Sequence, residues 1–295
     1  MRKESNGRMK ATKEFSADLL LRSSTACVRD VYCQGTCKGR SPEEYATATE
    51  LVFPYRGTYV RHLGEDQAVG EANQVLFFNN AEGYRVSHPI PGGDASLSLA
   101  IKPELLLEIV PPELLSSESM LMFKRQRLRI DARAQALVAM LRHSLRQNVV
   151  EPLEAEGLAL TLVQRALGPR TTHAPGASIG LQRLVDRVKL VIASDLARRW
   201  TLGEIAAEVR GSPVYLTQVF QQVEGMPLYR YQLRLRLARA LDLLESYEDL
   251  TTLSIELGFS SHSHFGAAFR EAYGRTPSEF KRSVLGPIKA SPTSH

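Results

Sequence analysis

An internal repeat in the C-terminal third constrains this chain more than any other feature of its sequence. Residues of matching type recur 49 positions apart, at Phe220 and Phe269, Gly225 and Gly274, and Tyr231 and Phe280. A fixed period with matched residue types indicates two copies of one structural unit. We therefore predict two similar folded units within residues 200–282.

The first copy carries the start and stop signals of two short helices. Thr201 is a good N-cap, and Glu204, three residues later, completes a capping box. Apolar residues then recur at helical spacing until Gly211, which breaks the helix. Ser212 can cap a second helix that has Pro213 at its first position, where the missing N–H is not needed. This stretch is therefore predicted to fold as helix, tight turn and helix.

The second copy follows the same plan. Gly258 ends its first helix, Ser260 or Ser261 caps the second, and Phe265 and Phe269 face inward. Two helices joined by a short turn that contains glycine, with polar side chains outward on the second helix, form a helix-turn-helix. The sequence thus predicts an all-α region made of two helix-turn-helix units.

Several stretches of this region resemble the AraC-type DNA-binding domain. Residues 257–265 (LGFSSHSHF), 269–270 (FR) and 274–280 (GRTPSEF) look like its second half, and residues 234–244 (RLRLARALDLL) look like its long central helix. The resemblance covers roughly the last third of the chain. It departs from the family pattern at Arg210-Gly211, which replaces the usual glycine–apolar pair, and at Leu228, where proline is common.

The resemblance implies which side chains face DNA. The base-reading positions would be Val214, Thr217, Gln218 and Gln221 in the first unit, and His262, Ser263, Gly266 and Arg270 in the second. The phosphate contacts would come from Arg230, Arg234, Arg236, Arg275 and Lys281. Because Gly266 and Ala267 offer almost no hydrogen-bonding groups, we expect the first reading helix to discriminate more between sequences. The central helix is expected to hold the two reading helices about one turn of DNA apart.

The net charge of this region does not by itself indicate nucleic-acid binding. Residues 181–285 contain 14 lysines and arginines against 12 aspartates and glutamates. The prediction therefore depends on the repeat and on the clustering of arginines in residues 230–239, as phosphate contacts require. Without the repeat, such a cluster is equally typical of a solvated helix face.

Residues 15–101 show the sequence pattern of a β domain. Strand-like runs occur at Asp18–Arg22, Thr49–Phe53, Gly57–His62, Gln74–Phe78 and Ala95–Ile101, and turn signals separate them at 64–66, 79–83 and 91–94. Many short strands with frequent turns suggest a sandwich or a barrel. Together with the C-terminal resemblance, this region is similar to the cupin-like effector domain that often precedes an AraC-type reader.

The histidines of this region do not indicate a metal-dependent enzyme. His62 and His88 stand alone, without the His-x-His pair that a metal-dependent cupin generally offers. We therefore predict no catalytic residue, no metal and no cofactor. The barrel is expected to enclose a polar-lined binding cavity or to be filled by its own side chains. The alternative function is an enzyme, with a cupin as the catalytic domain and the helical tail serving assembly.

The cysteines Cys27, Cys33 and Cys37 fall within eleven positions, and the sequence contains no others. Their spacing does not match a Cys-x-x-Cys zinc site. They can be small buried hydrophobes with one exposed thiol. They can also be a thiol or metal sensor, since the nearby Lys38 and Arg40 would favour a thiolate. A local disulfide is a third reading, which a reducing cytoplasm disfavours.

Beyond Lys102 the sequence pattern becomes helical. Two amphipathic runs, one capped by Asp131 and one at residues 153–167, offer either a dimer surface or packing against their own barrel. We predict a disordered tail (1–14), an effector-binding and dimerisation domain (15–167), a linker (168–180), the DNA-binding domain (181–285) and a second disordered tail (286–295).

We therefore predict an α+β protein of two domains that regulates transcription by binding double-stranded promoter DNA. No apolar core follows Met1, and no run approaches the roughly 18 apolar residues of a membrane span, which suggests a cytoplasmic protein without a membrane partner. The expected partners are a second copy in a homodimer, an unidentified small molecule or chemical signal, and RNA polymerase if the protein activates.

Overall fold

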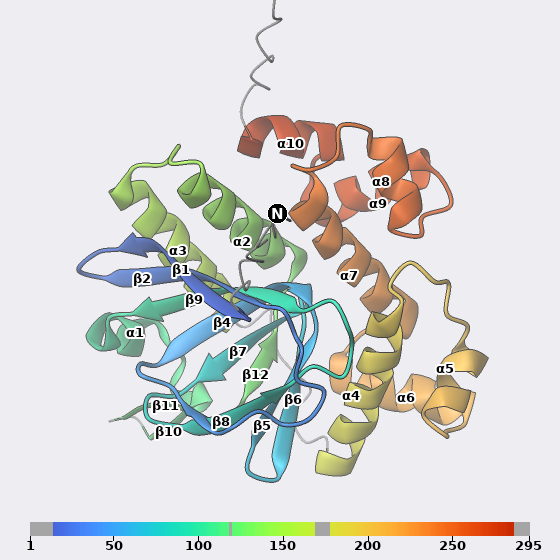
Figure 1. Ribbon diagram of the computed structural model, residues 1–295, viewed down its shortest axis with the longest axis horizontal. Helices are drawn as coiled ribbons and strands as arrows, with labels where there is room; N and C mark the ends of the chain where they lie inside the picture. The colour runs from blue at the N-terminus through green and yellow to red at the C-terminus, as the bar shows by residue number, and fades with distance from the viewer. Residues whose placement is uncertain (1–13, 118–119, 169–177, 286–295) are drawn as a thin grey trace, which may run out of the picture.

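The computed structural model describes residues 14–117, 120–168 and 178–285, which form a sheet-rich N-terminal domain and a helical C-terminal domain (Figure 1). The larger sheet has six strands in the order β1 (Phe15–Arg22), β2 (Ala26–Cys33), β9 (Asp94–Ile101), β4 (Glu50–Gly57), β7 (Gln74–Phe78) and β12 (Arg127–Arg129). The smaller sheet has the order β3 (Glu44–Tyr45), β8 (Gly83–Ser87), β5 (Tyr59–Leu63) and β6 (Asp66–Gly70). β10 (Leu115–Ser117) and β11 (Met120–Phe123) pair with each other.

Antiparallel pairing gives each strand of the larger sheet two different faces. On one face, residues such as Val28, Leu51 and Leu99 are fully buried against helices. Those helices are α1 (Pro103–Ile109), α2 (Ala132–Arg146) and α3 (Pro152–Leu167), and a short 3-10 turn (Pro112–Leu114) follows α1. The other face of the sheet looks toward the smaller sheet and borders a cavity lined by both. The N-terminal domain therefore places one layer of helices outside two sheets.

The strand-like runs predicted from the sequence lie in β1, β4, β5, β7 and β9. The predicted turns at 64–66, 79–83 and 91–94 fall near the junctions β5–β6, β7–β8 and β8–β9. The strands that complete the two sheets were not predicted from the sequence, namely β2, β3, β6, β8 and β12. The sheet-rich class is confirmed, and the likeness to a cupin stays a prediction.

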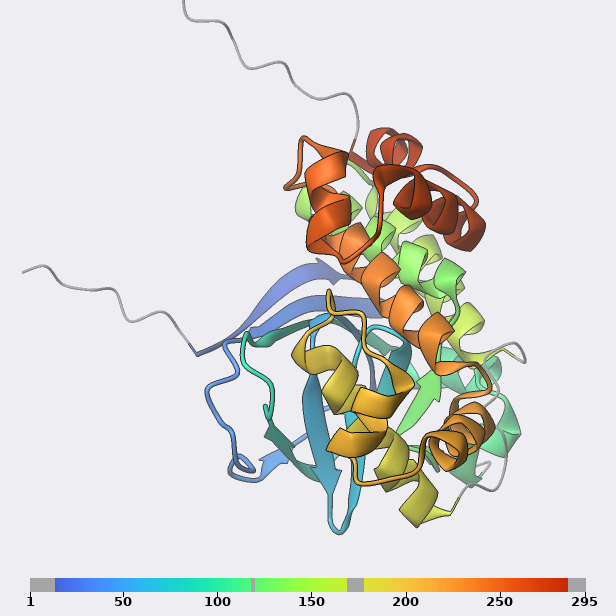
Figure 2. The same ribbon diagram turned by 90° about the vertical axis from the view of Figure 1, so that its right-hand side faces the viewer.

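Seven helices are described in the C-terminal domain. They are α4 (Ile179–Ser194), α5 (Leu202–Glu208), α6 (Pro213–Glu224), α7 (Leu228–Leu243), α8 (Leu250–Glu256), α9 (His262–Tyr273) and α10 (Pro277–Leu285). One apolar core joins α4, α5, α6 and the start of α7, and a second joins the end of α7 with α8, α9 and α10. Helix α7 runs between these two units (Figures 1 and 2).

Helix α2 lies between the two domains. Leu141 on one face packs in the core of the N-terminal domain, while Ala139 belongs to the core of the second helix-turn-helix unit. Helices α2 and α3 therefore pack on their own domain, which is one of the two arrangements predicted from the sequence. Helix α2 also contacts the helical C-terminal domain, hereafter called the reader. Within the described residues, no helix is both long enough and apolar enough to span a membrane.

The predicted domain boundaries can be compared with the described elements. β1 begins at Phe15, α3 ends at Leu167, and α4 begins at Ile179. Most of the predicted linker, nearly all of the N-terminal tail and the whole C-terminal tail lie outside the described residues. Their boundaries stay predictions.

Candidate nucleic-acid interface and the N-terminal cavity

The first helix-turn-helix unit begins with the capping box predicted from its sequence. The Thr201 hydroxyl accepts from the Glu204 amide at 3.2 Å, and the Glu204 carboxylate accepts from the Thr201 amide at 2.8 Å. The hydrogen bonds that the Glu204 carboxylate accepts from the Thr201 amide, the Thr201 hydroxyl and Arg198 lower the pKa of Glu204 to about 2, with the Thr201 amide as the largest cause. The start of α5 is therefore fixed by its own side chains.

The turn between α5 and α6 contains a residue in an unusual conformation. Arg210 has a φ of 56°, in the left-handed region that favours glycine. It occupies the place of the glycine that is usual in the AraC pattern. Helix α6 then begins at Pro213, where Ser212 accepts a hydrogen bond from the Tyr215 amide, and Gly225 caps its end with a φ of 63°.

Helix α6 presents two chemically different faces. Its inner residues, among them Leu216 and Phe220, are fully buried. All four predicted base-reading residues of the first unit are exposed, namely Val214, Thr217, Gln218 and Gln221. The Thr217 hydroxyl donates to the Pro213 carbonyl of its own helix at 3.1 Å. The methyl group is the apolar part of this exposed side chain. This face carries two amides, for which the described part of the chain supplies no hydrogen-bond partner, and two apolar groups, a combination that suits a DNA major groove.

The second unit has the same plan with different caps. Asp249 accepts from the amides of Thr251 and Thr252 at the start of α8, and Ser261 caps α9 by accepting from the His264 amide. Along α9, His262, Ser263 and Arg270 are exposed, and Gly266 is half-buried. Three of the four predicted reading positions of this unit are therefore exposed and carry hydrogen-bonding side chains, whereas Gly266 offers none.

Two predicted phosphate contacts need correction. The Arg236 side chain lies inside the domain, where its guanidinium donates to the carbonyls of Leu196, Ala197, Arg198 and Gly258 at 2.8–3.0 Å. Arg234 is largely buried and donates to the Ile130 carbonyl of the N-terminal domain at 2.6 Å. Both guanidinium groups are committed to backbone carbonyls in this structure and do not face a phosphate.

The other predicted phosphate contacts lie nearer the surface. Arg230 is exposed at the start of α7. Arg275 is exposed and donates to the Ser283 hydroxyl, and Lys281 is half-buried and donates to the Tyr247 carbonyl. These three assignments stay predictions.

Charged side chains connect the reader to the N-terminal domain. The Asp242 carboxylate of α7 is 1% exposed and accepts from Arg56 at 2.8 and 3.0 Å and from Arg142 at 3.0 Å. Arg239 also donates to it. The hydrogen bond to Asp242 is the largest cause that raises the pKa of Arg56. Arg56 lies in β4 and Arg142 in α2, so this cluster joins three elements of two domains.

A second set of buried charges lies where α4 meets the N-terminal domain. Lys189 Nζ is 2.7 Å from Glu224 Oε1 and 4.0 Å from Glu71 Oε1, and all three side chains are at most 2% exposed. Burial raises the pKa of Glu71. Arg127 and Asp186 form another buried pair, with 2.7 Å between Nη1 and Oδ1. These pairs were not predicted from the sequence, although polar residues stand at apolar-periodic positions of α4 and were the available signal.

The N-terminal domain holds a cavity of about 540 Å³ between its two sheets. Its lining includes Cys33 and Cys37, and it does not include Cys27, which lies six residues earlier along β2. At about 3.3 Å per residue, this places Cys27 roughly 20 Å from Cys33. The three cysteines are free thiols, each half-buried. Two of the three predicted sensor residues therefore share a cavity, and the third does not.

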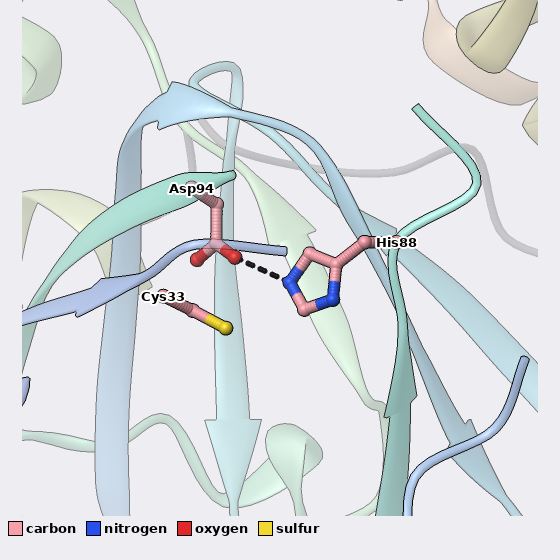
Figure 3. A group of neighbouring side chains, drawn as sticks. All are labelled: Cys33, His88 and Asp94. Carbon is pink, nitrogen blue, oxygen red and sulfur yellow. Dashed lines mark hydrogen bonds and ion pairs between the residues drawn. The ribbon is translucent and has the colours of Figure 1, made fainter. Parts of the chain in front are cut away.

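Three side chains of different chemistry meet at the wall of this cavity (Figure 3). His88 Nε2 lies 2.6 Å from Asp94 Oδ1, and Cys37 Sγ lies 3.2 Å from His88 Nδ1. The ligand atoms of Cys33, His88 and Asp94 all lie within 4.8 Å of one another. Burial is the largest cause that raises the pKa of Cys33. Sequence analysis does not predict this group, because its members are far apart in the chain.

The fold and its two exposed reading helices define a double helix-turn-helix protein. Residues 182–283 match a family of helix-turn-helix domains. This match takes in both helix-turn-helix units and no part of the N-terminal domain.

Similar proteins are named as transcriptional regulators. The HTH-type transcriptional activator CfaD of Escherichia coli is 35% identical over 32% of this chain and 36% of its own length. The chain spans 36–43% of the length of three curated relatives that it matches.

Among solved structures, an AraC-type DNA-binding domain-containing regulator from Chromobacterium violaceum is 27% identical over 37% of this chain and 97% of its own, with a TM-score of 0.35. ToxT from Vibrio cholerae, solved with an unsaturated fatty acid, is 13% identical over 91% of this chain and 99% of its own, with a TM-score of 0.35.

Proposed function

We propose that this protein is a sequence-specific transcription regulator whose C-terminal domain binds promoter DNA and whose N-terminal domain senses a chemical signal. The observation that carries this proposal is the pair of helices α6 and α9, each built into a core on one face and exposed on the other. An enzyme with a helical assembly domain would not need two helix-turn-helix units that repeat one plan. The names of the relatives support regulation over catalysis.

The route for a signal runs through α2, β4 and α7. Helix α2 belongs to the core of the N-terminal domain and also contacts the reader. Arg56 in β4 and Arg142 in α2 both donate to Asp242 on α7. A ligand that shifts β4 or α2 changes this carboxylate's partners, and such contacts have discrete alternatives rather than a continuous range. We propose that sensing alters the seating of α7, and with it the spacing of α6 and α9.

The proposed partners follow from the same surfaces. Both faces of α2 are used within the chain, so the proposed homodimer would use the outer face of α3, where Leu153 is 81% exposed. RNA polymerase is a proposed partner if the protein activates transcription, and a cytoplasmic location belongs to the same proposal.

Capture of genomic DNA by the full chain, followed by sequencing of the bound fragments, tests the proposal. We expect fragments that share a sequence motif, with an affinity that falls as salt rises because phosphate contacts release counterions. Gln218→Ala should weaken the enrichment of that motif. Gln222→Ala is the matched control, because this exposed glutamine lies on the same helix at a position that is not predicted to read bases. A folded protein that enriches no motif over input DNA would contradict the proposal.

A further inference from the structure

We propose that Cys33, His88 and Asp94 bind a thiophilic divalent metal ion, such as Zn²⁺, at the wall of the N-terminal cavity. Thiolate, imidazole and carboxylate are the three ligand types that zinc takes from proteins. Three protein ligands leave a fourth position open, which is typical of sites that exchange or react rather than of structural zinc sites. Here the open position would face the cavity that the same residues line.

The distances between the three ligand atoms are close to those of a tetrahedral metal site, so small side-chain movements would suffice to hold an ion. The three ligand atoms lie within 4.8 Å of one another, and His88 Nε2 is 2.6 Å from Asp94 Oδ1. Metal bonds of about 2.0–2.3 Å place tetrahedral ligand atoms about 3.3–3.8 Å apart. The His88–Asp94 pair therefore opens by about 1 Å and Cys33 closes by a similar amount. Figure 3 shows the sulfur and the carboxylate on the same side of the imidazole.

The backbone around these ligands is tightly packed. Cys33 ends β2, His88 follows β8, and Asp94 begins β9. The His88 amide donates to the Cys37 carbonyl at 2.8 Å, which ties the loop after β2 to the end of β8. A Cβ atom at Gly93 would lie 2.3 Å from the Cys33 carbonyl oxygen, so only glycine permits this approach. The three ligands are thus brought together by a close meeting of three strand ends.

Cys37 occupies the position of an outer-shell partner. Its Sγ lies 3.2 Å from His88 Nδ1, the ring nitrogen that does not face Asp94. Histidine ligands of metals nearly always donate their second ring N–H to a partner, usually a carboxylate, a backbone carbonyl or water, and this fixes the ring orientation and the tautomer. Both cavity cysteines therefore have a place in one site, Cys33 as a ligand and Cys37 as the group behind the imidazole.

The charge of the cavity favours a cation. Its described lining carries the carboxyl groups of Glu14, Glu44, Glu50 and Asp94, and it contains no lysine or arginine. Arg29 pairs with Glu50 at 3.0 Å from outside the lining. Among the described residues, Asp94 has an ion-pair contact with His88 and with no lysine or arginine. An anionic ligand would meet carboxylates here, whereas a divalent ion would be attracted by them.

The site is one residue away from the contact that reaches the reader. In the sheet, Asp94 pairs with Gly57, and the preceding residue of that strand is Arg56, which donates to Asp242 of α7. Movement of Asp94 toward an ion therefore acts on the strand that holds Arg56. We infer that binding of the metal is the signal that changes the affinity for DNA. This regulatory half of the proposal rests on the proposed function, whereas the metal-binding half does not.

Titration of the chelator-treated, reduced full chain with Co²⁺ tests metal binding directly. We expect a near-ultraviolet sulfur-to-cobalt charge-transfer band that Zn²⁺ abolishes in competition. Cys33→Ser should lose the band, and Asp94→Asn should weaken binding by more than about 100-fold. Cys37→Ser should keep the band with affinity lowered by about 10–100-fold, as for other outer-shell changes. Cys27→Ser is the matched control and should resemble the unmodified chain, with circular dichroism confirming that each variant is folded.

Two results of the Co²⁺ titration would overturn the metal site. One is the absence of a charge-transfer band in the folded, unmodified chain, and the other is a Cys33→Ser band equal to that of Cys27→Ser. Rapid alkylation of Cys33 that saturating Zn²⁺ does not slow would also count against it and would favour a metal-free thiol sensor.

The regulatory half has a separate readout. Affinity for a captured genomic site, measured with and without Zn²⁺, should change by about 5–150-fold, the usual range of coupling between sites. Cys33→Ser should remove that change. Metal binding without any change in DNA affinity would refute regulation and leave the metal site standing, whereas failure to bind DNA in either state would refute the proposed function.

Discussion

Replacing Asp242 by asparagine should destabilise the protein at the contact between its domains. The Asp242 side chain is 1% exposed, and it accepts from Arg56, Arg142 and Arg239. Removing one partner of a buried ion pair costs about 3–5 kcal/mol, because the remaining charge is left uncompensated. Here Arg56 and Arg239 are 38% and 32% exposed, so water can partly hydrate them. We therefore expect a loss of about 2–4 kcal/mol for Asp242→Asn.

Urea denaturation measures this loss through two probes. Trp200 is the sole tryptophan and lies in the reader, so its fluorescence follows that domain, while far-ultraviolet circular dichroism follows the whole chain. The control is Glu245→Gln, because Glu245 is 51% exposed and faces His143 at 3.4 Å. Because half of the Glu245 side chain is hydrated, although His143 is only 7% exposed, we expect this pair to contribute about 0–1 kcal/mol. If Asp242→Asn and Glu245→Gln lower stability equally, within about 0.5 kcal/mol, the assigned role of the buried cluster is wrong.

Four further variants test the reader. Gln218→Ala should lose about 1–3 kcal/mol of discrimination at one base pair, whereas Arg230→Ala should weaken all sequences alike and reduce the salt slope by about 1; equal losses on specific and random DNA for Gln218→Ala would contradict base reading. Arg210→Gly should stabilise the chain by about 0.5–1 kcal/mol in thermal melts. The reason is that the strain of the left-handed φ of 56° at an arginine exceeds the entropic cost of ordering a glycine there. A lower melting temperature for this variant would contradict the prediction. Glu204 has a pKa lowered to about 2 in the folded state, against 4.5 for the free side chain. The unfolded chain therefore binds more protons between these values, so the contribution of Glu204 is present above about pH 4.5 and is lost as the pH falls toward 2; Glu204→Gln should flatten stability over that window, and an unchanged acid profile would refute the assignment.

The helical domain could be predicted from sequence because its signals are local. The capping box at Thr201, the proline at the start of α6 and the αL glycines at 225 and 274 each act within one turn of the chain. The exposed face of α6 follows from the 3.6-residue period alone. Buried ion pairs such as Lys189–Glu224 depend on which elements meet in space, and no local pattern specifies them.

The arginines of α7 show where local reasoning fails. Arg234, Arg236 and Arg239 look like a solvated or phosphate-binding face, yet α7 is buried on most sides by both helix-turn-helix units and α2. A long arginine side chain can cross an apolar helix surface and place its guanidinium on backbone carbonyls. Arg236 does this with four carbonyls and so ties the two units together.

The N-terminal site was beyond sequence reasoning for a topological reason. Strand β2 alternates apolar and polar residues less clearly than its neighbours, because Asp30 is buried against Tyr55 and Arg146 on the helix side. Without β2, Cys33 has no assigned place beside β9. The separation of Cys33, His88 and Asp94 along the sequence then matches no metal-binding motif, because the three residues meet only after nonlocal strand pairing.

Footprinting of the full chain on a captured genomic site measures directly whether both units bind DNA. We predict two protected major-groove segments about 10 base pairs apart, centre to centre, as two reading helices on one face of the duplex require. Gln218→Ala should weaken protection of one segment, and Arg270→Ala should weaken the other. A single protected segment, or two segments that both variants weaken equally, would contradict a reader made of two helix-turn-helix units.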